Sequence, residues 1–264
     1  MLKKSELPLL IVIPARLKSS RLPNKLLLDL GGQTVLQRTW SQCMAVKHPV
    51  DVVIATDSEL ILEQAEAFGA KVFLSKKEHL TGTSRCLELW HNLSTNGALY
   101  GGMINVQGDE PFVPTTLIED LCLERLERKE EVLTVAAPIS DLNDLKAPQV
   151  VKVVFSEFNG RVHYFSRHAI PFVRDEPIDR WLLKQNHWRH IGLYAFSSEA
   201  CTSSKLALSS PLAESEKLEQ LAWLDRGLSI GIWRSENIPP GIDTPEDLER
   251  ARTRIARNND ELFM

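Results

Sequence analysis

Short apolar runs alternate with amphipathic segments through the first half of this sequence, and that alternation limits the possible folds more than any other feature. Each run is long enough for one strand and is rich in Val, Ile and Leu, as buried parallel strands are. The predicted strands cover residues 9–13, 50–55, 71–74, 98–106 and 132–137, and the predicted helices cover 35–44, 58–68, 85–93 and 116–126. Strand–helix repeats of this kind predict an α/β fold with a mostly parallel sheet between helices, whose ligands bind beyond the carboxyl ends of the strands.

The pattern changes from about residue 140 onwards. Two strands form a predicted hairpin, 150–155 and 161–165, and they are followed by a strand at 189–196, a helix at 214–224 and a strand at 229–233. There is no repeat, low-complexity tract or linker. We therefore expect one domain over 1–264, with a smaller β-rich subregion inserted at about 140–205.

Capping residues mark where several helices begin. Thr34 and Thr244 are predicted N-caps, and Pro245 suits the first helical position. Thr116 and Glu119 have the spacing of a capping box. These signals place the start of each helix within a residue or two.

Composition excludes several classes of protein. The net charge of −4 and the pI near 6.0 give no general attraction to nucleic acid or to an anionic membrane. The N-terminal apolar run is too short for a signal peptide or a membrane span. The four cysteines form no CxxC pair, so reduced thiols in the core are expected. We predict a cytoplasmic protein with no nucleic-acid partner and no membrane insertion.

The stretch of residues 11–25 begins in the first predicted strand and continues as a cationic loop. Its cations are Arg16, Lys18, Arg21 and Lys25, separated by small and hydroxyl residues and bracketed by prolines. Backbone N–H groups and long cations at the end of a strand suit phosphate oxygens. The alternative is an ordinary solvated basic loop.

Two acidic residues stand where the ends of strands are expected. Asp109 follows a buried strand, and Asp243 precedes the well-capped helix at 245. Two carboxylates near a phosphate loop suit Mg²⁺, which takes a few protein oxygens and completes its shell with substrate phosphates and water. A turn-forming role for Asp109 and a capping role for Asp243 remain open.

Eight segments, in order, resemble the family of 3-deoxy-manno-octulosonate cytidylyltransferases, also called CMP-Kdo synthetases. They are IPARLKSSRLPNK at 13–25, ATD at 55–57, INVQGDEP at 104–111, VVKVVF at 150–155, YFSRHAIP at 164–171, RHIGLYAF at 189–196, KLEQL at 217–221 and GIDTPEDLER at 241–250. The resemblance spans about residues 10–254. The related sialate cytidylyltransferases share the first loop, but QGDEP and the GIDTPEDL ending are not expected in them.

The resemblance implies a Rossmann-like nucleotidyltransferase that joins an eight-carbon keto-acid sugar to the α-phosphate of CTP, with Mg²⁺, for lipopolysaccharide biosynthesis. The single domain over 1–264 is then a nucleotidyltransferase domain, whose inserted subregion at about 140–205 serves sugar binding and dimerisation in a homodimer. The implied catalytic residues are Arg16, Lys25, Asp109 and Asp243, the last two as metal ligands. Nucleotide contacts fall on Pro14, Ala15, Arg16, Ser19, Arg21, Lys25, Thr81, Gly82, Arg85 and Gln107. Sugar contacts fall on Gln107, Arg167, His190, Tyr194, Glu219 and Gln220.

Structural roles compete with some of these assignments. His190 could be a satisfied strand histidine, Gln107 a turn residue, and Glu219 and Gln220 part of an exposed helix face. The sequence also departs from the family pattern at Leu80, Ser84, Ala213 and Ala222. The alternatives are therefore a variant keto-acid sugar, such as 8-amino-Kdo or a sialate, and a non-catalytic nucleotide-binding relative.

Overall fold

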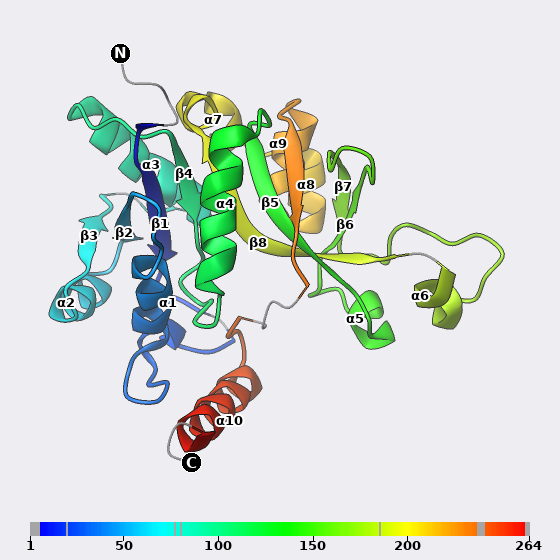
Figure 1. The fold of residues 1–264 in the computed structure, drawn as a ribbon, viewed down its shortest axis with the longest axis horizontal. Helices are drawn as coiled ribbons and strands as arrows, with labels where there is room; N and C mark the ends of the chain where they lie inside the picture. The colour runs from blue at the N-terminus through cyan, green and yellow to red at the C-terminus, as the bar shows by residue number, and fades with distance from the viewer. Residues whose placement is uncertain are drawn as a thin grey trace. The chain divides into compact units, whose positions relative to one another are not determined.

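The computed structural model of the protein describes residues 6–19, 21–76, 78–79, 81–184, 186–236 and 241–261 (Figure 1). The chain forms two compact units. The first unit is Met1–Leu123 with Ile238–Met264, and the second is Glu124–Asn237. Within the described ranges, no helix has both the length and the apolar character needed to cross a membrane.

The first unit is built on a parallel sheet. Strand β1 (Leu9–Ala15) pairs with β2 (Val50–Thr56) on one side and with β4 (Gly102–Asn105) on the other. Strand β3 (Lys71–Leu74) pairs with the outer edge of β2, and all three pairings are parallel. Every residue of β1 is buried, which is why it reads as one continuous apolar run. The predicted strands of this unit are confirmed, although β4 is shorter than the predicted 98–106.

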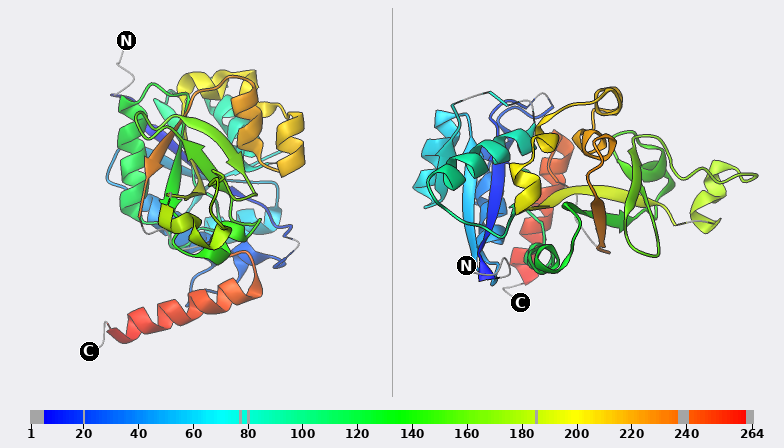
Figure 2. Two further views of the ribbon diagram at one scale, coloured as in Figure 1. Left: turned by 90° about the vertical axis from the view of Figure 1, so that its right-hand side faces the viewer. Right: turned by 90° about the horizontal axis from the view of Figure 1, so that it is seen from above.

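Helices accompany these strands. They are the 3-10 helix η2 (Lys25–Leu27), α1 (Val35–Met44), α2 (Glu59–Ala67), α3 (Gly82–Thr95), α4 (Thr115–Glu127), whose last residues belong to the second unit, and α10 (Pro245–Glu261). Thr34 caps α1 as predicted, because its side chain accepts the N–H of Gln37. Thr244 likewise accepts the N–H of Asp247 at the start of α10, the long helix that approaches the C-terminus in Figure 2.

Two predicted helix starts in the first unit were wrong. Helix α3 begins at Gly82 and not at 85, because the Thr81 side chain accepts the N–H of Ser84 and caps it. The predicted capping box at Thr116 does not form, since Thr116 lies inside α4. The carboxylate of its partner, Glu119, instead accepts the backbone N–H of Lys47 at 3.1 Å.

The second unit contains a mixed sheet. Strand β5 (Val132–Pro138) is antiparallel to β8 (Trp188–Ser197) and parallel to β9 (Ile230–Arg234). Strand β6 (Lys152–Phe155) pairs with β8 and forms the predicted antiparallel hairpin with β7 (Val162–Ser166). The fold class is therefore confirmed as α/β with a mostly parallel central sheet. The single domain with an insertion at about 140–205 stays a prediction.

The helical segments of the second unit are short. They are α5 (Leu142–Lys146), η3 (Ile178–Arg180), α6 (Trp181–Lys184), α7 (Ser198–Thr202), η4 (Ser204–Ala207), α8 (Pro211–Glu216) and α9 (Glu219–Asp225). The single helix predicted for 214–224 was wrong, because the chain breaks at Lys217, whose φ of 52° is left-handed. Leu218 after the break is buried, so the turn brings an apolar side chain into the core.

Aromatic side chains fill the core of the second unit. Phe196 and Tyr194 on β8 both pack edge-on against Trp223 of α9, with ring centroids 5.4 and 5.0 Å apart. Edge-to-face pairs of this kind stabilise a core beyond the area that they bury. All four cysteines of the chain are buried and free, as predicted.

Candidate active site

The cationic loop begins where β1 ends. Pro14 and Ala15 are the last two residues of β1, and Arg16 after them is exposed. Ser19 is half-buried. Lys25 opens η2 directly after Asn24, whose left-handed φ of 52° turns the chain. The end of β1, the loop after it and the start of η2 thus carry the predicted phosphate-binding residues.

Asp109 and Asp243 converge on Lys25. The Lys25 Nζ donates to Oδ2 of Asp109 and, at 2.8 Å, to Oδ1 of Asp243. Arg21 Nη2 donates to the other oxygen of Asp243 at 2.9 Å. The structure therefore brings four predicted site residues together from three separate parts of the chain.

The electrostatics of this cluster keep Lys25 charged. Its side chain is only 14% exposed, and burial alone would lower its pKa. The neighbouring carboxylates of Asp109 and Asp243 outweigh that effect and raise the pKa above its ordinary value. The ammonium thus balances two carboxylates that would otherwise repel each other.

Backbone contacts fix the two carboxylates relative to one another. The Ile242 N–H donates to the Asp109 carbonyl at 2.9 Å, so the residue before Asp243 is bonded directly to the backbone of Asp109. Asp247 Oδ2 accepts the N–H groups of Asp243 and Thr244 at 3.1 and 2.9 Å. Asp247 was not predicted as a positioning residue, although the T-x-x-D spacing could have identified it.

The donor set suits a hard cation. Within the described part of the chain, no group of three or more His, Cys, Asp or Glu side chains is placed to hold a metal ion. Asp109 and Asp243 offer carboxylate oxygens only, and both reach the same ammonium. Two carboxylates that share a cation fit Mg²⁺, which leaves much of its shell to phosphates and water.

Gly82 at the start of α3 packs against residues of β1 and of the segment after β4. A Cβ at Gly82 would lie 3.2 Å from Pro14 Cγ and 3.4 Å from Gln107 Oε1, so these three predicted nucleotide contacts lie together. Gln107 Nε2 donates to Oδ1 of Asn105 at 3.3 Å. Asn105 is fully buried, and it holds the Gln107 amide in one orientation.

Arg85 is the remaining nucleotide contact predicted on α3. It is buried, and its Nη2 donates to Asp57 Oδ2 at 2.6 Å. The structure thus gives Arg85 a partner from the ATD motif at the end of β2. Ser84, one of the departures from the family pattern, bonds to Thr81 through its hydroxyl, whereas Leu80 lies outside the described residues.

His190 and Tyr194 lie side by side on β8 in the second unit. Their ring centroids are 5.5 Å apart, and the His190 ring also packs edge-on against Phe165. His190 Nε2 lies 2.8 Å from the Thr134 hydroxyl. Burial lowers the pKa of His190 to about 3, so its imidazole is neutral at physiological pH.

Tyr194 connects His190 to α9. Its hydroxyl lies 3.4 Å from Gln220 Oε1, to which it donates, and Gln220 is buried. Burial and then the nearby charge of Glu219 raise the pKa of Tyr194 well above its ordinary value, so the phenol keeps its proton. Four of the six predicted sugar contacts therefore lie close together in the second unit: His190, Tyr194, Glu219 and Gln220.

Arg167 takes a different position from the other predicted sugar contacts. Its Nε donates to the Glu216 carbonyl at 2.6 Å, Nη1 to the Pro148 carbonyl at 3.0 Å and Nη2 to the Lys217 carbonyl at 3.3 Å. These bonds use three of the five guanidinium N–H groups. Arg167 thus holds the break between α8 and α9, a role that the sequence did not indicate.

Comparison with known proteins defines the class of enzyme. The family model described as cytidylyltransferase matches residues 10–230. Together with the α/β fold and the cationic loop, this match shows that the chain belongs to the cytidylyltransferase family. It is a nucleotidyltransferase.

Two similar sequences in that family carry the same name. The chain is 41% identical to the 3-deoxy-manno-octulosonate cytidylyltransferase of Francisella tularensis subsp. holarctica (strain LVS), over 92% of this chain and 96% of the relative. It is 39% identical to the enzyme of the same name from Chlorobium limicola, over 94% and 97% of the two chains. A solved structure of CMP:2-keto-3-deoxy-manno-octonic acid synthetase complexed with CTP is 31% identical, with a TM-score of 0.85 over 95% of this chain and 99% of that one. The resemblance found in the motifs is confirmed.

Proposed function

We propose that this protein joins the anomeric hydroxyl of 3-deoxy-manno-octulosonate to the α-phosphate of CTP and releases pyrophosphate. The observation that carries the proposal is the convergence of Asp109 and Asp243 on Lys25, beside a cationic loop at the end of β1. The names of the relatives support the choice of sugar and nucleotide. Four buried, free cysteines fit the reducing cytoplasm, where we place the reaction.

In the proposed reaction, negative charge develops on the phosphates of CTP. The sugar hydroxyl oxygen forms a bond to the α-phosphorus and loses its proton, while the bond from that phosphorus to the β-phosphate oxygen breaks. When bound at Asp109 and Asp243, Mg²⁺ would neutralise part of the negative charge on the triphosphate. Arg16, Arg21 and Lys25 supply fixed positive charge along the same segment, and such electrostatic positioning dominates phosphoryl-type transfer.

We assign sugar binding to the cluster on β8 and α9. His190, Tyr194 and Gln220 are held in place by mutual contacts and by Thr134. Polar side chains that are already held in place lose little entropy when a ligand binds, which suits a cluster that orients the attacking hydroxyl. Arg167 is the proposed cation for the sugar carboxylate.

The structure bears on the variant sugar that remains as the alternative. An 8-amino group would need an acidic partner such as Glu214 or Glu216. Each Glu216 oxygen already accepts one hydrogen bond, from the Ser166 hydroxyl at 2.7 Å and from the Arg167 N–H at 2.8 Å, whereas Glu214 is exposed. Ala213 and Ala222 are buried in this unit. The choice between the two sugars therefore rests on the kinetic comparison below.

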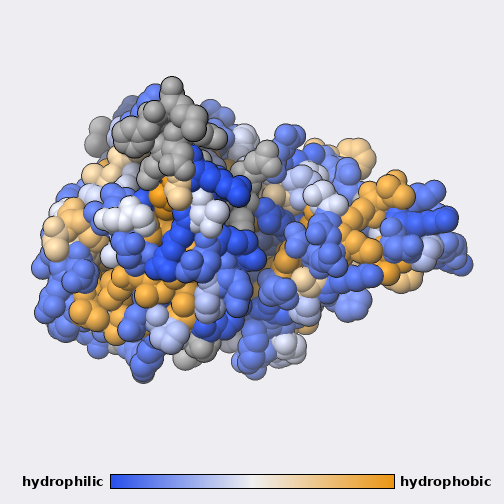
Figure 3. Space-filling view, turned by 90° about the horizontal axis from the view of Figure 1, so that it is seen from below, coloured by the Kyte–Doolittle hydropathy of each residue, from blue (hydrophilic) through white to orange (hydrophobic). Residues whose placement is uncertain are grey.

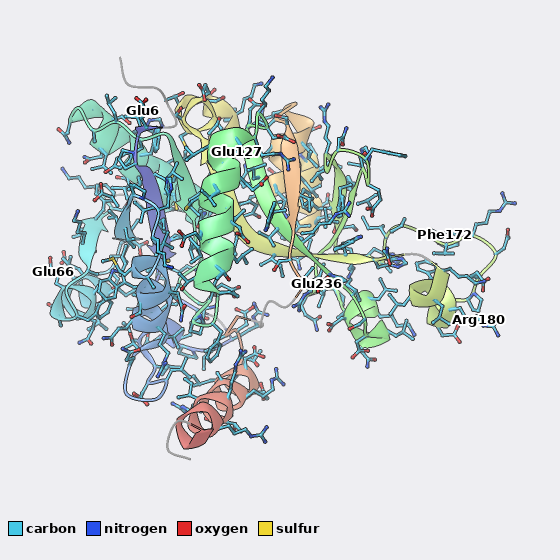
Figure 4. The ribbon with its side chains drawn as sticks, viewed as in Figure 1. Glu6, Glu66, Glu127, Phe172, Arg180 and Glu236 are labelled. Atoms are coloured by element: carbon cyan, nitrogen blue, oxygen red, sulfur yellow. The ribbon has the colours of Figure 1, made fainter. Side chains whose placement is uncertain are left out.

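We also propose that the protein is a homodimer. Phe172 comes before α6 (Figure 4), Leu183 lies in α6, and the two residues are 74% and 82% exposed. Apolar surface gathers over this segment (Figure 3). Exposed apolar side chains that adjoin a packed cluster, here around Trp181, are typical of association surfaces.

Pyrophosphate release with a panel of nucleotides and sugars tests the function. We expect turnover with CTP and 3-deoxy-manno-octulosonate, dependence on added Mg²⁺, and loss of turnover in EDTA. Preference for the 8-amino sugar or a sialate would favour the alternative. Binding of CTP without turnover of any sugar would identify a non-catalytic relative.

A further inference from the structure

Three polar side chains form a cluster beside the start of α3. Ser75 directly follows β3, and its hydroxyl donates to Oε2 of Glu88. His79 Nε2 lies 2.5 Å from the same carboxylate oxygen and 3.1 Å from the Ser75 hydroxyl. None of the three residues belongs to the site described above.

The cluster is largely shielded from water. Ser75 is buried, and the side chains of His79 and Glu88 are 12% and 23% exposed. Burial alone would raise the pKa of Glu88, but the hydrogen bonds from Ser75 and His79 lower it below its ordinary value. Glu88 is therefore a carboxylate at neutral pH, and charge-assisted hydrogen bonds to it are the stronger kind.

These bonds connect the chain before α3 to the body of that helix. Glu88 lies in the second turn of α3, whereas His79 comes two residues before Thr81, the N-cap. The Ser75 N–H also donates to the Thr56 carbonyl at 2.7 Å, which anchors the cluster to β2. The start of α3 is thus held by two contacts: Ser75 bonds to Thr56 of β2, and His79 bonds to Glu88 inside α3.

The segment held in this way carries predicted nucleotide contacts. Thr81 and Gly82 begin α3, and Gly82 packs against Pro14 and Gln107. A cluster that served stability alone could stand beside the start of any helix. The cluster of Ser75, His79 and Glu88 stands beside Thr81 and Gly82, which are both predicted nucleotide contacts. A displacement of about 1 Å at such a position is enough to impair binding or catalysis substantially.

We propose that Ser75, His79 and Glu88 are positioning residues that fix the start of α3 and thereby set the affinity and selectivity for the nucleotide. The proposal rests on the nucleotide-binding role given above to Thr81 and Gly82. It assigns these three residues no contact with substrate.

Steady-state kinetics of substituted enzymes test the proposal. In Glu88→Gln and His79→Phe, we expect KM for CTP to rise about tenfold, which corresponds to about 1.4 kcal/mol. We expect kcat and KM for the sugar to change less than about twofold and the preference for CTP over UTP to fall, because the start of α3 carries predicted nucleotide contacts and no predicted sugar contact. His91→Phe is the matched control, since His91 lies on the same helix with an exposed side chain.

A milder pair of variants separates positioning from folding. Ser75→Ala removes the hydroxyl that bonds to Glu88, and Ser75→Thr keeps it. We expect the CTP KM to rise in the first variant and to return to the wild-type value in the second. This pair decides the question if Glu88→Gln fails to fold.

Two results would overturn the proposal. One is a wild-type KM and nucleotide preference in folded Ser75→Ala and His79→Phe; the other is an equal loss in every kinetic parameter. If the wild-type protein itself does not turn over CTP, the proposed function fails first. Normal wild-type turnover with unaffected variants would refute the positioning role alone.

Discussion

Replacing Gly241 by alanine should separate the two carboxylates of the active site. Gly241 lies beside Ile242, whose N–H donates to the Asp109 carbonyl at 2.9 Å. A Cβ at position 241 would lie 3.0 Å from that same carbonyl oxygen and 2.8 Å from Glu110 Oε1. The Glu110 side chain can rotate away, but the Asp109 carbonyl belongs to the backbone.

The expected cost follows from these distances. The backbone of Gly241 is not left-handed, so alanine can adopt its backbone conformation. The cost of the substitution comes from the close contacts of the added Cβ. Relief of the contact requires a shift of about half an ångström. That shift weakens one hydrogen bond, worth about 0.5–1.5 kcal/mol net, and overpacking adds about 1–3 kcal/mol. The folded state should survive this loss.

The catalytic effect should be larger than the effect on stability suggests. Asp243 comes two residues after Gly241, so the shift changes its distance from Asp109. We expect kcat to fall about 10- to 100-fold, as misplacements of up to an ångström do. The Mg²⁺ concentration for half-maximal rate should also rise.

The assay is pyrophosphate release over a range of Mg²⁺ concentrations, with the melting temperature measured alongside. The matched control is the double variant Glu110→Ala, Gly241→Ala, which removes the nearer contact and keeps the one with the Asp109 carbonyl. We expect no recovery in the double variant. Wild-type kcat and Mg²⁺ dependence in Gly241→Ala would refute the reasoning.

Three further predictions concern the predicted metal and sugar residues. Asp109→Asn and Asp243→Asn should each fold and lose several orders of magnitude in kcat; full turnover of either would exclude it as a metal ligand. Arg167→Ala should lower the melting temperature by freeing three carbonyls and raise the sugar KM with little effect on the CTP KM; unchanged sugar kinetics would contradict its role. Because burial lowers the pKa of His190 to about 3, only the unfolded chain binds its proton between pH 6.5 and 3. Stability should therefore fall as pH falls through that window, by up to about 1.4 kcal/mol per pH unit more than in His190→Gln, which denaturant titrations would measure.

The elements of the first unit could be predicted from sequence because their signals are local. A strand buried on both faces is apolar at every position, as β1 is, so its run needs no knowledge of its neighbours. The caps at Thr34 and Thr244 each form with a residue three positions later in the chain. A pattern of a few residues is therefore enough to predict such a strand and such helix starts.

The start of α3 was predicted three residues late although its cap, Thr81, is local, whereas two other errors arose where a distant contact decided the structure. Glu119 bonds to the backbone of Lys47, 72 residues away, and so does not complete a capping box. The helix predicted for 214–224 breaks at Lys217, and its freed carbonyls bond to Arg167, about 50 residues away. A lysine carries no local signal for a left-handed conformation.

The same limit applies to the candidate site. Asp109 and Asp243 could be proposed separately, because each stands beside a recognisable strand end or helix start. Their shared partner Lys25 is separated from them by 84 and 218 residues, and no local pattern reports that pairing. The contacts among Ser75, His79 and Glu88 span only 4 to 13 residues, but they join the end of a strand to a helix, and no periodic pattern indicates such a pairing.

The hydrogen-bond network around His190 narrows what this residue can recognise. The Thr134 hydroxyl has one hydrogen and lies 2.8 Å from the Leu193 carbonyl, to which it donates. Its oxygen must then accept from His190 Nε2, so Nε2 carries the proton of the neutral imidazole. The other nitrogen, Nδ1, is left as an acceptor and repels a carboxylate. His190 can therefore bind a sugar hydroxyl but not the acid group, and the recognition of that group falls to a cation such as Arg167, whose two remaining N–H groups lie one on each Nη.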